Sequence, residues 1–244
     1  MEYGISGYRS SQDHYRTKTV VQLDKHQSDL SGDGVAETIY LLGIKNNDDL
    51  IINEITLVIE NGKDKERRYY AIPTSSGMGG GIHVEDFNHD GQLDIGVYIL
   101  SGGTGNELKY YLLLNHNHEF CLAFSSDMYE EKMKYQVQYL DRYQVEVKNL
   151  NSEQTRLINL KDKSPEYLKV IYDEQGMLKE PIQGIVAHVS DADSIESKMF
   201  DQGSDLILTH RILGRSHNDT LGYVSAYLVF DNEKYHVYKI LVSQ

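Results

Sequence analysis

The stretch Asp86–Asp94 reads Asp-Phe-Asn-His-Asp-Gly-Gln-Leu-Asp and leads directly into the apolar run Ile95–Leu100. It places oxygen-bearing side chains at loop positions one, three, five and nine, with glycine at position six. Ca²⁺ takes about six to eight oxygen ligands, and alternating ligand and spacer residues aim successive side chains at one point. The glycine relieves the backbone where the loop turns sharply. We therefore expect a calcium site in this loop.

The same pattern occurs upstream in the stretch Asp29–Glu37, which reads Asp-Leu-Ser-Gly-Asp-Gly-Val-Ala-Glu. Two aligned copies, each entering an apolar run, are much harder to obtain by chance than one acidic turn. In both copies the residue at position seven would contribute its main-chain carbonyl. The predicted ligands are Asp29, Ser31, Asp33, Val35 and Glu37 in the first loop, and Asp86, Asn88, Asp90, Gln92 and Asp94 in the second.

An EF-hand is the competing interpretation of these loops, and the spacing argues against it. An EF-hand requires a bidentate Glu at position twelve and a helix on each side. Position twelve is Tyr40 in the first copy and Val97 in the second, and both lie in β-rich runs. The acid at position nine instead closes a shorter loop that leads into a strand.

The pattern Asp-x-Asn-x-Asp-Gly-x-x-Asp before an apolar strand resembles the FG-GAP and VCBS repeats of integrin-like β-propellers and many bacterial surface proteins. More closely, the chain resembles uncharacterised VCBS-repeat proteins of spore-forming Gram-positive bacteria. In those a Ser-Gly-Gly-x-Gly segment follows the second loop, as Ser101–Gly105 does here, and a late Asp-Thr-Leu-Gly-Tyr-Val segment matches Asp219–Val224. The resemblance runs from about Val20 onward. It implies metal binding by the loops and says little about molecular function.

Composition and charge narrow the class of partner. The 244 residues suit one large domain or two small ones, and 40% hydrophobic and 25% charged residues are typical of a folded protein. The formal net charge of −13 argues against nucleic-acid binding, which depends on Lys and Arg neutralising phosphates. No run approaches transmembrane length, so we expect no membrane insertion.

The expected calcium sites indicate where in the cell the protein is located. Calcium loops of this kind make most sense where free Ca²⁺ is millimolar, and no signal peptide is visible. We therefore expect a secreted or cell-envelope protein whose export signal is not present in this sequence. The single cysteine, Cys121, lies in the apolar run Phe120–Phe124, where we expect a buried, unreactive thiol.

Short β-rich runs separated by turn signals every ~8–12 residues predict an all-β domain of antiparallel meanders. Units of roughly 60 residues suit the blades of a β-propeller. Three or four units are few for a closed ring, so we expect an incomplete or irregular propeller, with a β-sandwich as the alternative. After a polar segment 1–18, the single domain 19–244 divides into units 19–81, 82–125, 126–181 and 182–244.

The last unit resembles a worn third copy of the metal loop. Asp201–Asp205 matches its second half, but positions one and three fall on Ser197 and Met199. Methionine is not an oxygen ligand, so we expect little or no calcium there. Residues 126–134 are predicted to form the one short helix, and Ser164–Tyr172 fits either a strand or a helical turn.

Catalytic motifs are absent from the sequence. It contains no Gly-x-Ser-x-Gly, His-Glu-x-x-His or Cys-x-x-Cys pattern. The acidic pairs Asp48/Asp49 and Glu130/Glu131 could serve a glycosidase, but solvated charges explain them better. We therefore expect a non-catalytic module that binds a protein or a polysaccharide. The alternative is a hydrolase whose site lies among the Gly-rich loops near the metals.

Overall fold

Antiparallel strands arranged in three sheets dominate the computed structural model, which describes residues 18–46, 49–102, 107–231 and 234–244. The prediction of an all-β protein made of meanders is therefore confirmed. Three features of the sequence analysis lie wholly or partly outside the described residues: the polar N-terminal segment before Lys18, Asp48, and the Gly103–Gly105 part of the segment after the second loop.

The first two sheets are four-stranded meanders in which each strand pairs with the next along the chain. The strands of the first sheet are β1 (Lys18–Ser28), β2 (Glu37–Asn46), β3 (Asn53–Glu60) and β4 (Arg67–Ala71). Those of the second are β5 (Gly79–Glu85), β6 (Asp94–Leu100), β7 (Leu108–His116) and β8 (Glu119–Ser125).

The third sheet has seven strands in the order β11-β10-β9-β12-β13-β14-β15. Its last four strands repeat the meander of the preceding sheets, and β9–β11 add a second meander at the β12 edge. The strands are β9 (Tyr135–Leu140), β10 (Gln144–Asn149), β11 (Thr155–Asn159), β12 (Gln183–Glu196), β13 (Ser204–Leu213), β14 (Thr220–Asp231) and β15 (Lys234–Ser243).

Two short helices accompany the strands, α1 (Ser126–Lys132) and α2 (Pro165–Ile171). The second forms where the sequence allowed a strand or a helical turn. Ser164 caps it by accepting a hydrogen bond from the Tyr167 N–H, and Pro165 occupies its first turn, where proline is favoured. Within the described residues, no helix has the length and apolar character needed to cross a membrane.

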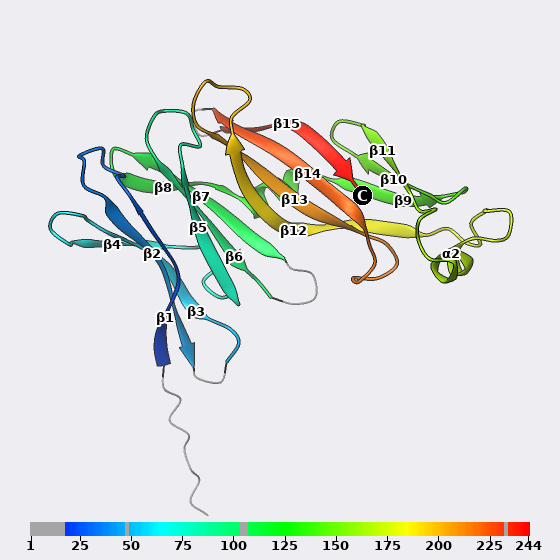
Figure 1. Cartoon of the computed structure of the whole chain (residues 1–244), viewed down its shortest axis with the longest axis horizontal. Coiled ribbons are helices and arrows are strands. Elements are labelled where there is room, and N and C mark those ends of the chain that lie inside the picture. The colour runs from blue at the N-terminus through cyan, green and yellow to red at the C-terminus, as the bar shows by residue number, and fades with distance from the viewer. Residues whose placement is uncertain (1–17, 47–48, 103–106, 232–233) are drawn as a thin grey trace, which may run out of the picture.

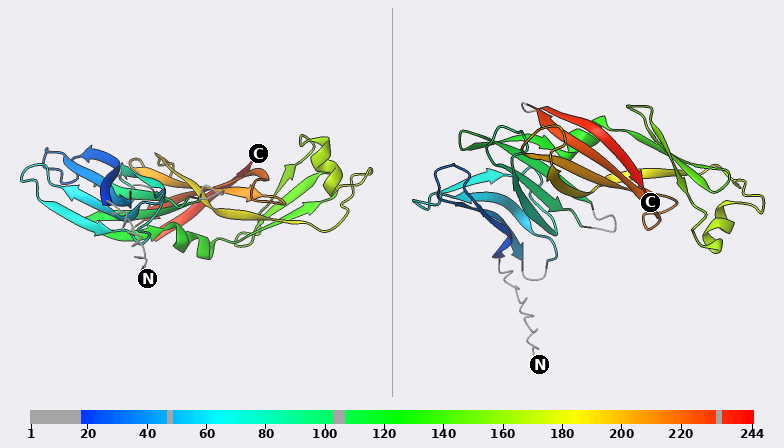
Figure 2. Two further views of the ribbon diagram at one scale, coloured as in Figure 1. Left: turned by 90° about the horizontal axis from the view of Figure 1, so that it is seen from below. Right: turned by 45° about the horizontal axis from the view of Figure 1, so that its top comes forward.

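The second sheet is the middle layer of the molecule, and both of its faces are buried. Alternate residues of β7 point to opposite faces. Tyr111 and Leu113 join the core shared with the first sheet, whereas Tyr110 and Leu112 join the core shared with β12–β15. A third core lies between β9–β11, α2 and the ends of β13 and β14. Figures 1 and 2 show the first sheet at one end of the long axis, with β9–β11 and α2 at the other.

Cys121 is exposed, so the prediction of a buried thiol was wrong. Its strand, β8, lies at the edge of the second sheet, where only one side has a neighbouring strand. Successive side chains of a strand alternate between faces, and the neighbouring Phe120 takes the buried position. An apolar sequence run therefore did not bring its cysteine into a core.

Candidate metal centre

The two predicted calcium loops are the first hairpin loops of the first two sheets, and they share one backbone structure. In each loop the carboxylate at position one accepts hydrogen bonds from the N–H groups at positions five and six. These bonds, 2.8–3.1 Å long, join Asp29 to Asp33 and Gly34, and Asp86 to Asp90 and Gly91. Both glycines have φ near +83°, a conformation that other residues rarely adopt. The repeated sequence pattern therefore folds into a repeated loop.

The acid at position nine closes each loop from the inside. One oxygen of its carboxylate accepts hydrogen bonds from the backbone N–H groups at positions two and three. These bonds, 2.9 and 3.2 Å long in each loop, join Glu37 to Leu30 and Ser31, and Asp94 to Phe87 and Asn88. Glu37 and Asp94 are buried, and each is the first residue of the following strand. The acid thus fixes the point at which β2 or β6 begins.

The worn third copy is the equivalent hairpin loop between β12 and β13. Its ninth-position acid, Asp205, is buried and accepts a hydrogen bond from the Lys198 N–H, as in the other loops, and another from the Tyr238 hydroxyl at 2.8 Å. The positive φ falls on Gly203, at position seven instead of six. The loop therefore keeps the closing acid, while Ser197 and Met199 stand where the ligands would be.

The charge balance differs between the first and second loops. Asp33 Oδ2 lies 2.6 Å from Lys63 Nζ, and this hydrogen-bonded pairing lowers the pKa of Asp33. Among the described residues, no Lys or Arg forms an ion pair with Asp86, Asp90 or Asp94. Burial raises the pKa of Asp94 to about 6. The second loop thus carries negative charge that no Lys or Arg offsets within the described part of the chain.

The side-chain oxygen atoms are also arranged differently in the two loops. In the first loop, Ser31 Oγ lies 3.4 Å from Asp29 Oδ1 and 3.5 Å from Glu37 Oε1. In the second, the side chains at positions three and five are joined by a 3.0 Å hydrogen bond from Asn88 to Asp90. Within the described part of the chain, no three His, Cys, Asp or Glu side chains are grouped closely enough to hold a metal ion. The residues fit Ca²⁺ in donor type and backbone shape, while several side chains are hydrogen bonded to the loop itself.

One buried side chain joins the first two loops. Asn115, near the end of β7, donates hydrogen bonds from its amide to the carbonyls of Leu30 (3.1 Å) and Leu93 (3.3 Å). Its own backbone N–H donates to Asp94 Oδ1 at 2.9 Å. Nothing in the loop spacing indicates this role, because Asn115 lies far from both loops in the sequence. We call the three loops 29–37, 86–94 and 197–205 together the loop edge.

The second loop also contacts the third. His89 Nδ1 lies 2.8 Å from the Gln202 carbonyl, and the His89 ring stacks on Phe200 with 4.2 Å between ring centroids. Its Nε2 lies 3.8 Å from Asp205 Oδ1, and neither buried atom has a hydrogen-bond partner within the described residues. The Ser204 N–H donates to the Asp86 carbonyl at 2.8 Å. The loop edge is therefore continuous. His89 occupies a spacer position of the loop pattern, so its role could not be predicted from the loop spacing.

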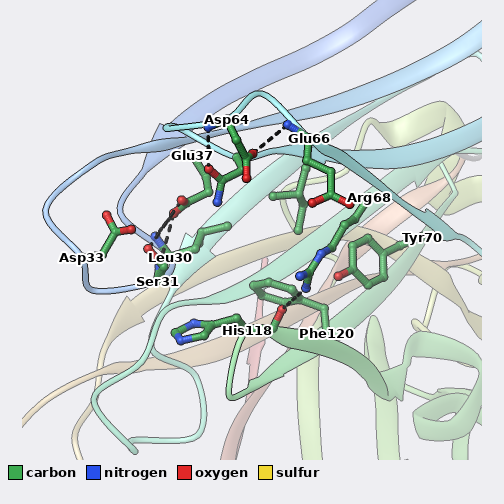
Figure 3. A pocket seen from close by; sticks show the side chains of 12 residues that line it. Leu30, Ser31, Asp33, Glu37, Asp64, Glu66, Arg68, Tyr70, His118 and Phe120 are labelled. Atoms are coloured by element: carbon green, nitrogen blue, oxygen red, sulfur yellow. Dashed lines mark hydrogen bonds between the residues drawn. The ribbon is translucent and has the colours of Figure 1, made fainter.

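A cavity of about 340 Å³ opens beside the first loop (Figure 3). Arg68 of β4 reaches across it and donates hydrogen bonds to Glu119 (2.8 Å) and to the His118 carbonyl (3.0 Å). Tyr70 and Phe120 form an apolar wall, with their rings edge to face at 5.8 Å. Four carboxylates also line the cavity: Asp33, Glu37, Asp64 and Glu66. No sequence motif marks Arg68 and Tyr70 of β4, or Lys63 of the preceding turn, as functional residues.

Comparison with known proteins identifies a relative and a family model. The family model described as YybI C-terminal domain matches residues 133–243, which contain β9–β15 and neither predicted calcium loop. The chain is 30% identical over 211 residues to a Bacillus subtilis (strain 168) protein described as "Uncharacterized protein YybI". That alignment covers 86% of this chain and 79% of the relative. No solved structure matches the chain.

Proposed function

The chain belongs to the YybI family, and on that premise we propose that it is a calcium-binding, non-catalytic module that recognises a protein or a polysaccharide outside the cytoplasm. A relative in a spore-forming Gram-positive bacterium agrees with one part of the resemblance stated from the sequence. The assignment of the loops to FG-GAP or VCBS repeats, and the secreted or cell-envelope location, belong to this proposal.

The unbalanced charge of the second loop carries the proposal. Asp94 is fully buried, and three carboxylates of one loop lack a basic partner among the described residues. Removing a charged carboxylate from water costs several kcal/mol unless a counter-charge offsets it. A divalent cation would supply that charge. The residues that would hold it are Asp86, Asn88, Asp90, the Gln92 carbonyl and Asp94.

The proposed role of calcium is structural. The ion would pin each loop to the first residue of the following strand, Glu37 of β2 or Asp94 of β6. A slip of one residue would turn the buried side chains of that strand to the opposite face. Because β6 lies in the middle layer, such a slip would disrupt two cores at once.

The cavity beside the first loop is the proposed recognition surface. Its aromatic wall of Tyr70 and Phe120 gives apolar contact area, and Arg68 with the surrounding carboxylates gives polar contacts. Aromatic residues and arginine are enriched where proteins bind partners. The hydrolase alternative gains little here. Ser31 Oγ faces Asp29 and Glu37, and among the described residues it has no hydrogen bond to a histidine that could activate it.

Calorimetric titration of the chelator-treated full chain with CaCl₂ tests the metal. We expect saturable binding that Asp86→Ala abolishes at the second loop and that Mg²⁺ competes for weakly, since Mg²⁺ demands a stricter geometry. A glycan array probed with and without Ca²⁺ tests recognition, with Tyr70→Ala as the variant. Absence of calcium binding by the wild type would show that the loops are closed by hydrogen bonds alone.

A further inference from the structure

A second cavity, of about 410 Å³, lies at the other end of the third sheet from the loop edge. It is bounded by α1, by residues 185–188 near the start of β12 and by residues 210–213 at the end of β13. The loop edge meets the same two strands at Glu196 and Ser204. The volume falls within the range of small-molecule sites, roughly 300–1,000 Å³. The calcium proposal gives this cavity no role.

A β-bulge beside the cavity fixes the ring of His210. The register of β12 against β13 shifts between Val186 and Val189, so Ala187 has no paired residue on β13. The Ala187 carbonyl lies 2.8 Å from His210 Nδ1. A carbonyl only accepts hydrogen bonds, so Nδ1 carries the proton and Nε2 is a bare acceptor. Burial lowers the pKa of His210, which keeps the ring neutral.

The acceptor on His210 has no partner among the described residues, although the residue is only 3% exposed. Leaving a buried polar atom without a hydrogen bond costs about 1–3 kcal/mol. Bulges are over-represented next to active sites because they re-aim side chains. A ligand that donates a hydrogen bond to Nε2 would remove this cost.

The same bulge places His188 against α1. His188 Nδ1 lies 2.6 Å from Glu130 Oε2, and the other oxygen of Glu130 accepts the Val189 N–H at 2.7 Å. Both oxygens of this carboxylate are therefore engaged. Lys134 and Glu107 add one side chain of each charge to the lining. The lining thus selects for a neutral ligand over a strongly charged one.

We propose that this cavity binds a neutral, hydroxyl-bearing ring, such as one sugar unit, with a hydroxyl donating to His210 Nε2. The C–H face of the ring packs on the apolar part of the lining, which Met133, Ile185 and Leu213 form. This site is separate from the cavity beside the first loop, and its occupancy does not depend on calcium.

The test uses the full chain and two probes, N-acetylglucosamine and the charged amine cadaverine, each titrated to millimolar concentration with and without chelator. Imidazole ¹H–¹⁵N correlation spectra report on His210 Nε2 directly. The blocking variant is Ile185→Trp, whose larger side chain would fill the cavity. The wild-type Ile185 side chain is 54% exposed, so the substitution does not disturb a buried position. Its matched control is Leu157→Trp on β11, whose wild-type side chain is 56% exposed.

We expect the sugar to shift the His210 Nε2 signal saturably, in chelator as in calcium. Ile185→Trp weakens that binding by about tenfold or more, and Leu157→Trp leaves it unchanged. The proposal is overturned if the sugar leaves His210 Nε2 unmoved, if cadaverine alone moves it, or if both tryptophan variants bind the sugar equally. These outcomes can be interpreted even if the loops do not bind calcium, because the sugar titration is also performed in chelator.

Discussion

Lys63 Nζ lies 2.6 Å from Asp33 Oδ2 in the first loop, whereas Asp90, at the same position of the second loop, has no basic partner among the described residues. The lysine comes from the turn between β3 and β4, which lies beside the first loop. It therefore supplies part of the positive charge that a cation would bring, and it would compete with calcium for Asp33.

Replacing this lysine should strengthen calcium binding by the first loop. We expect Lys63→Ala to raise the calcium affinity of that loop several-fold, because Asp33 loses its competing partner and a nearby positive charge disappears. Calorimetric titration measures the change. Lys65→Ala, in the same turn, is the control and should leave the affinity unaltered. An equal effect of both variants would mean that only the general charge of the turn matters.

Removing a ligand from the second loop should make the fold less responsive to calcium. Asp90→Ala is expected to lower the melting temperature in Ca²⁺ and to blunt the drop that chelator causes in the wild type, since bound ligand stabilises by mass action. For a chain of this length each kcal/mol corresponds to about 2–4 °C. Asp201→Ala, in the third loop, should keep the full chelator response. A wild-type melting temperature that chelator leaves unchanged would contradict the structural role of calcium.

Gly203 should tolerate substitution less well than Gly91. Both have positive φ, which costs an alanine about 1–2 kcal/mol. A Cβ on Gly203 would also lie 2.6 Å from the Asp86 carbonyl oxygen and 2.4 Å from His89 Nδ1, whereas one on Gly91 meets nothing within 4 Å. Urea unfolding in chelator should therefore show the larger loss for Gly203→Ala. Equal losses of unfolding free energy would indicate that the contact between the second and third loops does not contribute to stability.

The buried His210 should make the protein acid-sensitive. Burial lowers the pKa of His210 from its ordinary value of 6.5. Below pH 6.5 the unfolded chain therefore binds a proton at this residue that the folded chain does not bind. Stability contributed by the neutral ring is present above that pH and is lost as the pH falls. We expect His210→Gln to flatten the decline in unfolding free energy between about pH 7 and 5. The exposed His236→Gln is the control, and an unchanged slope in the His210 variant would assign the decline to other groups.

The sequence predicted the strands and the loops because both depend on local rules. Alternating β-rich runs follow from the two-residue period of a strand, and the loop shape follows from Asp86, Gly91 and their counterparts Asp29 and Gly34. Position nine was also predicted, although the structure shows Asp94 hydrogen bonded to three backbone N–H groups. Calcium at these residues stays a prediction.

The rest of the site depends on contacts between residues far apart in the sequence. Asn115 reaches Leu30 from another sheet, and His89 reaches Asp205 from another loop. Neither pairing leaves a spacing that a single sequence displays. The same is true of His210 and Ala187, which meet only because β12 bulges. For Cys121 the strand was predicted, but not the face on which its side chain lies.

The pairing of β9 with β12 through only Gln183 and Gly184 has a consequence for how the molecule opens. The strands β9–β11 and α2 are attached by this short ladder, by one core shared with β13 and β14, and by a few side-chain hydrogen bonds such as that from Tyr167 to Asp219. Regions held by few backbone hydrogen bonds across a boundary often unfold as separate cooperative units. Amide hydrogen exchange should therefore release the protons of β10 at a lower opening free energy than those of β7, which is buried between two layers. The strands β9–β11 and helix α2 would then unfold before the second sheet, which is the middle layer.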